Sequence, residues 1–460
     1  MKPVVIAGAG LSGLAAGVYL ASRKYPVAVF EQRAYPGGRT YSFPDPYSGE
    51  TVDNGQHVLI AGYDGTMALL DMIGTRNLIR VQRRPHLLFH HPDLGFRSFS
   101  LPRLPSPLHL AWGMLTSNLF RPGDRLRLLR SGIGLLRSRR SLDEKLSGKT
   151  VAQWLELSKQ STETRRALWE PLAIAIMNEH CSTASASLFI RSLRKAFLEH
   201  WHASAFAIPT VGLSQLFAGP AVEFIRRNCG EVHCGLGVAE TLITDGKVSA
   251  VRMEDGSQWE AAGAILAVPS YRVQSILPEP LKSQGFLAGV EMLPQSPIVS
   301  VHLWFAADFM GSDDIVGVIG RRIQWIFNRR SISPTPDGIS RNLAGGYVSA
   351  VISAAHNFVG MSNEDLVSVA LEDLHLIYGP SIGRPSASLI VREKRATFSS
   401  SPLAETLRPS PRTPVPNLFL AGDWTDTGYP ATIEGAIISG RRSSDLMERW
   451  MQGGGASVSV

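Results

Sequence analysis

The first thirty or so residues alternate between short apolar runs and a glycine-rich turn. Val4–Ala7 and residues 27–30 are uninterrupted apolar runs, and residues 14–22 between them have the composition of a helix. Parallel strands that are covered on both faces read as continuous apolar runs. The pattern therefore predicts a strand–helix–strand unit with parallel strands at the start of the chain.

The same patterning divides the rest of the chain into helical and strand-rich stretches. A proline-punctuated segment at residues 102–107 opens a largely helical region that extends to about residue 202. A strand-rich block follows over residues 231–268, broken by the turn signals Asp245-Gly246 and Asp255-Gly256. Further strands are predicted at residues 298–305, 323–327, 347–352, 387–391 and 417–421, and a last helix at residues 431–451.

This order of elements predicts an α/β fold with a Rossmann-like nucleotide domain and a discontinuous substrate domain. We expect the nucleotide domain to be assembled from three pieces, residues 1–75, 206–272 and 409–452. The substrate domain would take its helical subdomain from residues 76–205 and its mixed sheet from residues 273–408, which leaves residues 453–460 as a flexible tail.

Length and composition agree with a globular protein of more than one domain. The chain has 460 residues, 44% of them hydrophobic, and three cysteines, which suits a reducing compartment. The apolar run at residues 4–21 is interrupted by glycines and is followed by no small-residue cleavage site. No other run approaches the roughly 20 apolar residues of a membrane span. We therefore expect a cytoplasmic protein.

The glycine-rich turn has the spacing of a dinucleotide-binding loop. Gly8 would make the tight turn, Gly10 would let the backbone approach a pyrophosphate, and Gly13 would let the helix pack closely against the strand. Amides at the start of the following helix would face the phosphates. Glu31 ends the second strand, where an acidic residue accepts ribose hydroxyls. The candidate binding residues in this unit are Gly8, Ala9, Gly10, Leu11, Ser12, Gly13, Glu31 and Gln32.

Two further motifs select FAD over NAD. Gly37-Gly38-Arg39-Thr40 follows Glu31, and Gly422-Asp423 lies near the other end of the chain. This combination resembles the flavin amine oxidase and carotenoid desaturase superfamily, so the implied nucleotide domain is an FAD-binding domain of the amine oxidase type. The resemblance also implies that the strand at Val238 meets the adenine. It implies that the last helix, opened by residues 430–436 with Pro430 at its start, points its positive end at the flavin. Thr432 and Ile433 in this segment, and Gly55 and Gln56, are further candidate cofactor-binding residues.

Three other segments narrow the resemblance. Asp53-Asn54-Gly55-Gln56-His57-Val58, residues 394–398 and residues 421–430 resemble the squalene-associated branch, the hydroxysqualene dehydroxylases of hopanoid biosynthesis. Met177-Asn178-Glu179 departs from the Leu-Asn-Thr expected there. The resemblance implies an FAD-dependent oxidoreductase that converts hydroxysqualene, a long isoprenoid, to squalene and takes electrons from a separate donor. A phytoene-type desaturase, a flavin amine oxidase and a non-catalytic prenyl-binding protein of this fold remain alternatives.

Asp53 and His57 are the candidates for direct chemistry. Departure of an allylic hydroxyl as water needs a proton, and Asp53 is the acidic residue nearest in sequence to the loop placed beside the flavin. The alternative is structural, because Asp and Asn stabilise turns and a single His is often a hydrogen-bonded scaffold residue. His180-Cys181 lacks companions at metal-ligand spacing, so no metal is expected.

The basic charge gathers in one segment. The formal net charge is +7, and residues 121–140 contain seven arginines against one acidic residue, Asp124, interleaved with leucines and isoleucine. Such a surface suits peripheral contact with an anionic membrane, here the inner face of the cytoplasmic membrane. A solvated helix face is the alternative. Nucleic acid is not an expected partner, because no recognition module accompanies the charge.

Overall fold

Five parallel strands form the central sheet of the nucleotide-binding half. A computed structural model describes residues 1–135, 145–283, 285–333 and 345–453. The strand order is β10 (Gly230–Cys234), β2 (Val27–Glu31), β1 (Val4–Ala7), β14 (Gly263–Leu266) and β20 (Leu418–Leu420). All four pairings are parallel. The sheet thus takes its strands from three separate stretches of chain, and every residue of β1, β2, β14 and β20 is buried, whereas the edge strand β10 buries only Val232.

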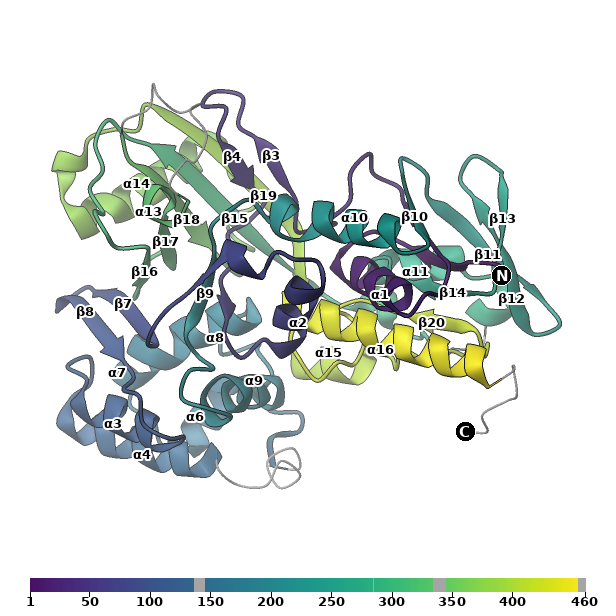
Figure 1. Ribbon diagram of the computed structural model, residues 1–460. Helices are drawn as coiled ribbons and strands as arrows, with labels where there is room; N and C mark the ends of the chain where they lie inside the picture. Colours follow the sequence, from purple (N-terminus) through teal and green to yellow (C-terminus); the bar gives the residue numbers. More distant parts are fainter. Residues whose placement is uncertain (136–144, 284, 334–344, 454–460) are drawn as a thin grey trace.

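Two different layers cover this sheet (Figure 1). One apolar core joins it to helices α1 (Leu11–Ser22), α2 (Asp64–Met72), α10 (Gly219–Arg227) and α16 (Ile433–Gln452). A second core joins its other face to α11 (Ser270–Ile276) and the antiparallel strands β11 (Val238–Thr244), β12 (Lys247–Met253) and β13 (Gln258–Glu260). The strand-rich block that the sequence predicts as one unit is therefore divided. Its two ends, β10 and β14, enter the parallel sheet, whereas its turn-separated middle forms the covering layer.

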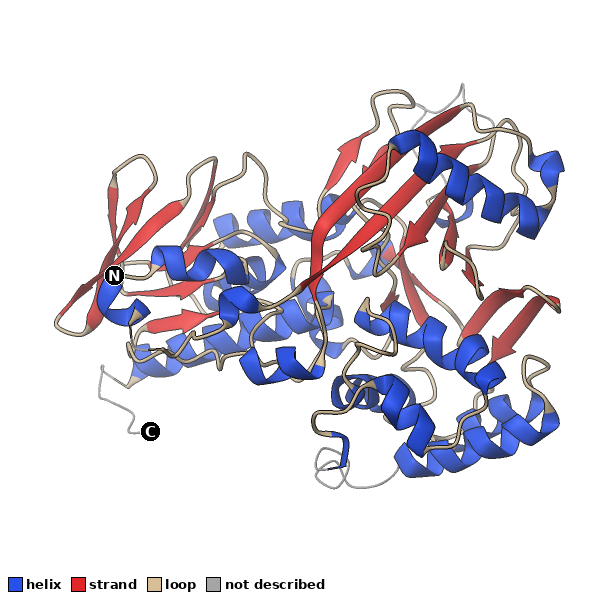
Figure 2. Cartoon of the chain, turned by 180° about the vertical axis from the view of Figure 1, so that it is seen from behind, coloured by secondary structure: helices blue, strands red, loops and turns tan. Residues whose placement is uncertain are grey.

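A seven-stranded mixed sheet dominates the other half of the molecule. Its order is β19 (Ala387–Phe398), β15 (Gln295–Trp304), β18 (Tyr347–Ile352), β17 (Trp325–Asn328), β16 (Ile315–Val318), β7 (His86–His91) and β8 (Gly95–Ser100). Neighbours are antiparallel except β16 and β7. The helix α14 (Asn363–Tyr378) packs on one face of the long strands (Figure 2). The opposite face therefore has to be covered by other segments.

A helical region lies below this sheet in Figure 1. It shares one core and comprises α3 (Leu108–Thr116), α4 (Pro122–Leu135), α6 (Val151–Leu157), α7 (Thr162–Thr164), η2 (Arg165–Trp169), α8 (Glu170–Met177) and α9 (Ala186–Leu198). Asn178 ties it to the sheet, because its side chain donates to the Ser296 carbonyl (3.2 Å) and Thr397 Oγ1 (3.0 Å) and accepts from the Ala354 amide (2.7 Å). The helical pattern predicted from the sequence corresponds to this region.

Smaller elements connect the two halves. Strands β5 (Leu59–Ile60), β9 (Phe206–Pro209) and β6 (Ile79–Val81) form a three-stranded sheet, and β3 (Ser42–Pro44) pairs with β4 (Thr51–Asp53). The remaining short elements are η1 (Arg76–Leu78), η3 (Ser214–Ala218), α12 (Glu279–Lys282), η4 (Val290–Met292), α13 (Arg329–Ile332), η5 (Pro380–Ile382) and α15 (Pro402–Leu407). The domain boundaries given above stay a prediction. Residues 136–140 of the predicted basic segment and residues 454–460 of the predicted tail lie outside the described residues.

Candidate functional site

The turn between β1 and α1 is built so tightly that side chains have no room at two of its glycines. Gly8 has φ +102°, and a Cβ there would lie 2.6 Å from the Ala267 carbonyl oxygen. A Cβ on Gly13 would lie 1.9 Å from the Gly8 carbonyl oxygen. These contacts bring α1 directly against the end of β1, which is the packing that the sequence predicts for a dinucleotide loop.

Gly10 differs from the other two glycines because the protein does not crowd it. Its backbone is extended (φ −71°, ψ 175°), and an added Cβ would meet only the Gly38 Cα at 4.0 Å. Gly10 is also the N-cap of α1 and offers no side-chain cap, although Leu11 and Ser12 in the first turn are buried. The first amides of a helix need partners from outside it. An uncapped, buried helix start with open space at Gly10 fits a bound pyrophosphate.

Glu31 lies beside this turn at the end of β2. Its Oε2 accepts from the Ala9 amide (2.8 Å) and its Oε1 from the Arg33 amide (3.0 Å). Each carboxylate oxygen keeps a lone pair for a further donor, such as a ribose hydroxyl. Gln32 points elsewhere, since its Nε2 donates to Glu254 Oε1 (3.0 Å) on an exposed surface. Val238 begins β11, and its buried side chain packs in the core beneath the parallel sheet.

The Gly37–Thr40 segment closes over the turn. The Gly37 amide donates to the Ala9 carbonyl (2.8 Å), and Gly10 and Gly37 form a parallel β-bridge. Both Gly37 (φ +112°) and Gly38 (φ +60°) adopt backbone conformations that favour glycine. Thr40 Oγ1 donates to the Gly37 carbonyl and fixes the end of the loop (2.8 Å). The two glycine motifs, which are separate in the sequence, thus lie next to each other in the structure.

The C-terminal motif reaches the same place through an ion pair. Arg39 lies 2.7 Å from the buried carboxylate of Asp423, and the Gly422 amide donates to Ser439 Oγ (2.9 Å) on α16. Arg408 is a supporting residue that the sequence reasoning missed. Its guanidinium donates to the carbonyls of Asp423 (3.1 Å) and Tyr429 (2.8 Å), and burial lowers its pKa to about 10. No spacing signal marks this arginine in the sequence.

The last helix begins two residues later than the sequence suggests. Thr432 is the N-cap of α16 and accepts from the Gly435 amide (3.0 Å), so Ile433 is the first helical residue and Pro430 lies outside the helix. Glu434 is buried and accepts from the amides of Gly65 (2.9 Å) and Thr66 (2.8 Å) at the start of α2. Burial raises the pKa of Glu434, and these hydrogen bonds oppose that shift. These hydrogen bonds hold the start of α16 against the start of α2.

The segment from Asp53 to His57 connects this region to the seven-stranded sheet. Asp53 Oδ1 accepts from Ser42 Oγ (2.7 Å) and the Leu213 amide (2.9 Å), while Oδ2 lies 3.8 Å from the Arg329 guanidinium. Gln56 accepts from Arg329 Nη1 through its Oε1 (2.9 Å). Asp53 thus braces two loops and has Arg329 as a basic neighbour. Arg329 is a second residue that sequence reasoning missed.

The environment of His57 differs from that of Asp53. Burial lowers the pKa of His57, the charge of Asp53 raises it and that of Arg39 lowers it, so the imidazole is neutral near pH 7. Neither ring nitrogen has a hydrogen-bond partner among the described residues. A Cβ on Gly55 would lie 3.8 Å from His57 Nε2, so the two residues are neighbours. The chemical roles suggested for Asp53 and His57 stay predictions.

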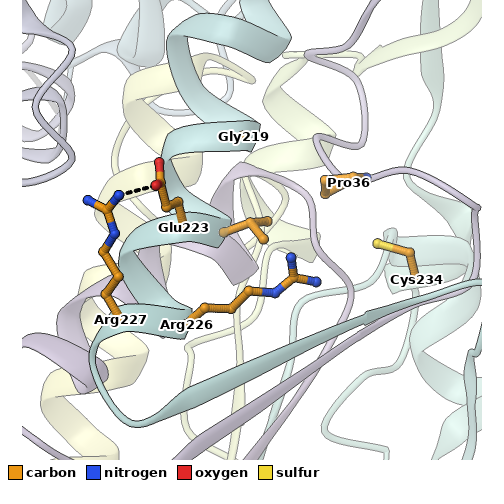
Figure 3. Close-up of a pocket in the computed structure, with 7 residues that line it drawn as sticks. Pro36, Gly219, Glu223, Arg226, Arg227 and Cys234 are labelled. Carbon is orange, nitrogen blue, oxygen red and sulfur yellow. Dashed lines mark hydrogen bonds and ion pairs between the residues drawn. The ribbon is translucent and has the colours of Figure 1, made fainter.

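An open pocket of about 480 Å³ lies between α10 and Pro36, the residue before the paired glycines (Figure 3). Its lining residues are Pro36, Gly219, Val222, Glu223, Arg226, Arg227 and Cys234. Arg227 pairs with Glu223, and Arg226 donates to the Val232 carbonyl (3.0 Å). None of the glycines of the dinucleotide turn lines this pocket, so we do not place the cofactor in it. Among the described residues, no group of His, Cys, Asp and Glu side chains has an arrangement that holds a metal ion.

The fold and this convergence of loops define an FAD-dependent oxidoreductase. The chain belongs to the family of flavin containing amine oxidoreductases, which matches residues 11–447. It is 31% identical to a hydroxysqualene dehydroxylase of Rhodopseudomonas palustris, over 97% of this chain and 98% of the relative. It is 24% identical to a 15-cis-phytoene desaturase of Arabidopsis thaliana, over 95% of this chain and 78% of that relative. The crystal structure of an oxidoreductase from Methanosarcina mazei has the same fold, with a TM-score of 0.74, 20% identity and coverage of 97% of this chain and 100% of that chain.

The family's cofactor, FAD, fits the geometry of the three loops. The uncapped start of α1 and the space at Gly10 suit the pyrophosphate, and Glu31 has acceptor capacity for the ribose. The Arg39–Asp423 pair joins the C-terminal segment to the residue after the paired glycines Gly37 and Gly38. The individual binding residues stay predictions.

Proposed function

We propose that this chain catalyses the reductive dehydroxylation of hydroxysqualene to squalene, as a step of squalene and hopanoid biosynthesis. The observation that carries the proposal is similarity over nearly the whole length to hydroxysqualene dehydroxylases, which includes the residues of both halves and not only the nucleotide loops. Both halves matter because the nucleotide half is shared by flavin enzymes of many activities.

The reaction needs a hydride, a proton and a dry site. Reduced FAD supplies the hydride when bound. The C–O bond breaks with its electron pair on oxygen, the oxygen takes a proton and leaves as water, and the allylic cation left behind accepts the hydride. Asp53 is our candidate for the proton donor, and the neutral imidazole of His57 lies beside it. A separate electron donor has to reduce the flavin again after each turnover.

Anaerobic single turnover tests this proposal directly. Photoreduced holoenzyme mixed with hydroxysqualene should be reoxidised while an equal amount of squalene appears. A phytoene-type desaturase is the second candidate, favoured by the similarity to 15-cis-phytoene desaturases. It would take hydride from its substrate, so oxidised holoenzyme would be reduced by phytoene. Reduction by phytoene together with no reoxidation by hydroxysqualene would replace the proposed function with the second candidate.

We also propose that α3 and α4 attach the enzyme to an anionic membrane surface from the cytoplasmic side. Among the described residues, no helix is long and apolar enough to cross a membrane. Instead Leu108, Trp112 and Leu115 lie on one exposed face of α3, with exposed fractions of 59%, 56% and 48%. Arg121 and Arg130 are exposed nearby on or beside α4, and Figure 1 places both helices at the end of the helical region away from the five-stranded sheet. Apolar side chains with flanking arginines are typical of an interfacial surface.

Changing Arg121 and Arg130 to Gln should weaken binding to anionic vesicles by about 30-fold. Each arginine near such a surface contributes about 1 kcal/mol, and added salt should reduce the difference between variant and parent. Sedimentation with vesicles of phosphatidylcholine, with and without phosphatidylglycerol, measures the effect. Arg252 pairs with Glu240 on β11 in the nucleotide-binding half, so Arg252→Gln serves as the control. Equal binding of variant and parent would mean that α4 is an ordinary solvated helix and does not contact the membrane.

A further inference from the structure

One face of the seven-stranded sheet carries polar side chains that are fully buried. On β15, Val299, Val301 and Leu303 face the core beneath α14, so Ser300 and His302 face the other way. In the β15–β18 register His302 is opposite Ser349. Residues directly opposite on antiparallel strands share a face, with their Cβ atoms about 5 Å apart. Ser300, His302 and Ser349 therefore form a polar group in the middle of the sheet.

Several atoms of this group and of the neighbouring Arg329 and Gln56 have no hydrogen-bond partner among the described residues. These buried unpartnered atoms are Ser300 Oγ, His302 Nε2, Ser349 Oγ, Arg329 Nε and Gln56 Nε2. We call these five residues the polar cluster. Ser349 and His302 are each 0% exposed, so bulk solvent does not reach them. A buried polar atom left without a partner costs about 1–3 kcal/mol, and a purely structural cluster rarely leaves so many.

Arg329 connects the sheet to the segment after Asp53. It contacts Gln56 and Asp53 as described above, and its charge acts on both His302 and Tyr347. His302 Nδ1 and the Tyr347 hydroxyl form a hydrogen bond of 2.9 Å, which fixes the imidazole and leaves Nε2 as its other polar atom. Burial, and secondarily the charge of Arg329, lower the pKa of His302 to about 3. The imidazole is therefore neutral, and the charge of Arg329 is balanced by Asp53.

The surroundings of the polar cluster are apolar. An apolar group on the same side of the sheet includes Phe327 and Val351, next to β9 residues and Val58. By register Phe327 lies opposite Ser349, and Val351 lies opposite Ser300. The cluster is thus a small buried polar area with apolar side chains around it. A ligand that matches it has one polar group on a long apolar chain.

We propose that the polar cluster binds the hydroxyl group of a long isoprenoid alcohol. The inference deepens the proposed function and rests on it. A hydroxyl group both donates and accepts, which suits a cluster that has free donors on Arg329 and Gln56 and serine hydroxyls that donate or accept. An ammonium group would meet Arg329 without a spare anion, and a carboxylate would have to compete with Asp53 for it. A neutral alcohol avoids both costs.

Ligand binding to the oxidised holoenzyme tests the proposal without turnover. Hydroxysqualene and squalene share a carbon chain and differ in the hydroxyl, and perturbation of the flavin absorbance reports the binding of each. Ser349→Ala and, separately, His302→Phe should weaken hydroxysqualene binding about tenfold, which is the usual worth of a buried hydrogen bond that loses its partner. Squalene binding should stay unchanged. Ser192→Ala removes a buried serine that already bonds to its own helix, at the Leu188 carbonyl (2.8 Å), and should change neither ligand.

Three outcomes would overturn the assignment to the polar cluster. Unchanged hydroxysqualene binding in Ser349→Ala, the smaller change, would mean that the cluster only holds buried water. Equal losses for hydroxysqualene and squalene would mean a structural role. A parent enzyme that does not prefer hydroxysqualene would remove the basis for hydroxyl recognition.

Single turnover of the parent enzyme separates these results from the proposed function. A parent that converts hydroxysqualene while the variants bind it normally refutes only the polar cluster, whereas a parent that does not convert it refutes both.

Discussion

A Gly10→Val protein should fold normally and lose its FAD. A Cβ added at Gly10 would meet no protein atom closer than the Gly38 Cα at 4.0 Å, so the apoprotein does not crowd this position. The pyrophosphate does not, because the glycine at this position lets the backbone approach the phosphates. The methyl groups would also separate the phosphates from the amides at the start of α1, and a charge-assisted hydrogen bond contributes about 1.5–3 kcal/mol. We expect FAD affinity to fall by roughly 10² or more, since overpacking adds a further 1–3 kcal/mol.

Two other glycines make this experiment specific. Gly360→Val places the same side chain in open space on an exposed loop and should leave the flavin content at the level of the parent. Gly13→Ala should instead destabilise the apoprotein, because its Cβ would lie 1.9 Å from the Gly8 carbonyl oxygen. Flavin absorbance of the purified proteins and thermal unfolding of the apoproteins measure these effects. A Gly10→Val protein with full flavin content would show that the pyrophosphate lies elsewhere.

The nucleotide-binding half could be predicted well because its signals are local. The strands β1 and β2 are continuous apolar runs, and a parallel sheet covered on both faces requires such runs. The glycine turn is equally readable, because Gly8 has a positive φ, Gly13 packs too closely for a side chain and Gly10 leaves space for a phosphate. The length of α1 was underestimated at its start, where Leu11, Ser12 and Gly13 are helical. Their sequence reads as a loop, and only the tight packing on β1 makes them helical.

The substrate-binding half was harder to predict because its strands carry mixed signals. The hairpin β7–β8 includes His86, His90 and His91 among its apolar residues and was not predicted. The strand β19 continues to Phe398, past the charged run Arg392–Arg395, where the sequence predicted an end at Val391. Pairing with β15 extends it, and propensity cannot show such pairing. The polar cluster was missed for the same reason, since its members come from four separate segments and share no spacing.

Asp53→Asn should slow squalene formation by roughly 10² to 10⁴ while FAD stays bound and reducible, because that is the usual contribution of a positioned proton donor. The substitution is nearly isosteric. The amide oxygen can still accept from Ser42 Oγ and the Leu213 amide, so the loops that Asp53 braces should keep their places. What the variant loses is the ability to carry a proton and the charge facing Arg329. Single-turnover reoxidation of the reduced flavin by hydroxysqualene measures the rate.

The structure supplies a reason to separate proton donation from charge balance in this test. Asp53 lies 3.8 Å from Arg329, so two roles have to be distinguished: balance of the Arg329 charge, or donation of a proton to the departing hydroxyl. Arg329→Gln removes the positive partner and keeps a hydrogen-bonding side chain. If Asp53 only balances Arg329, combining Asp53→Asn with Arg329→Gln should restore most of the rate, because both charges are then gone. If Asp53 donates the proton, the double variant should be as slow as Asp53→Asn alone.

Asp45→Asn changes another buried carboxylate, one that holds the Ser48 turn, and should leave the rate unaltered. Equal rates for Asp53→Asn and the parent would mean that another group donates the proton to the departing hydroxyl.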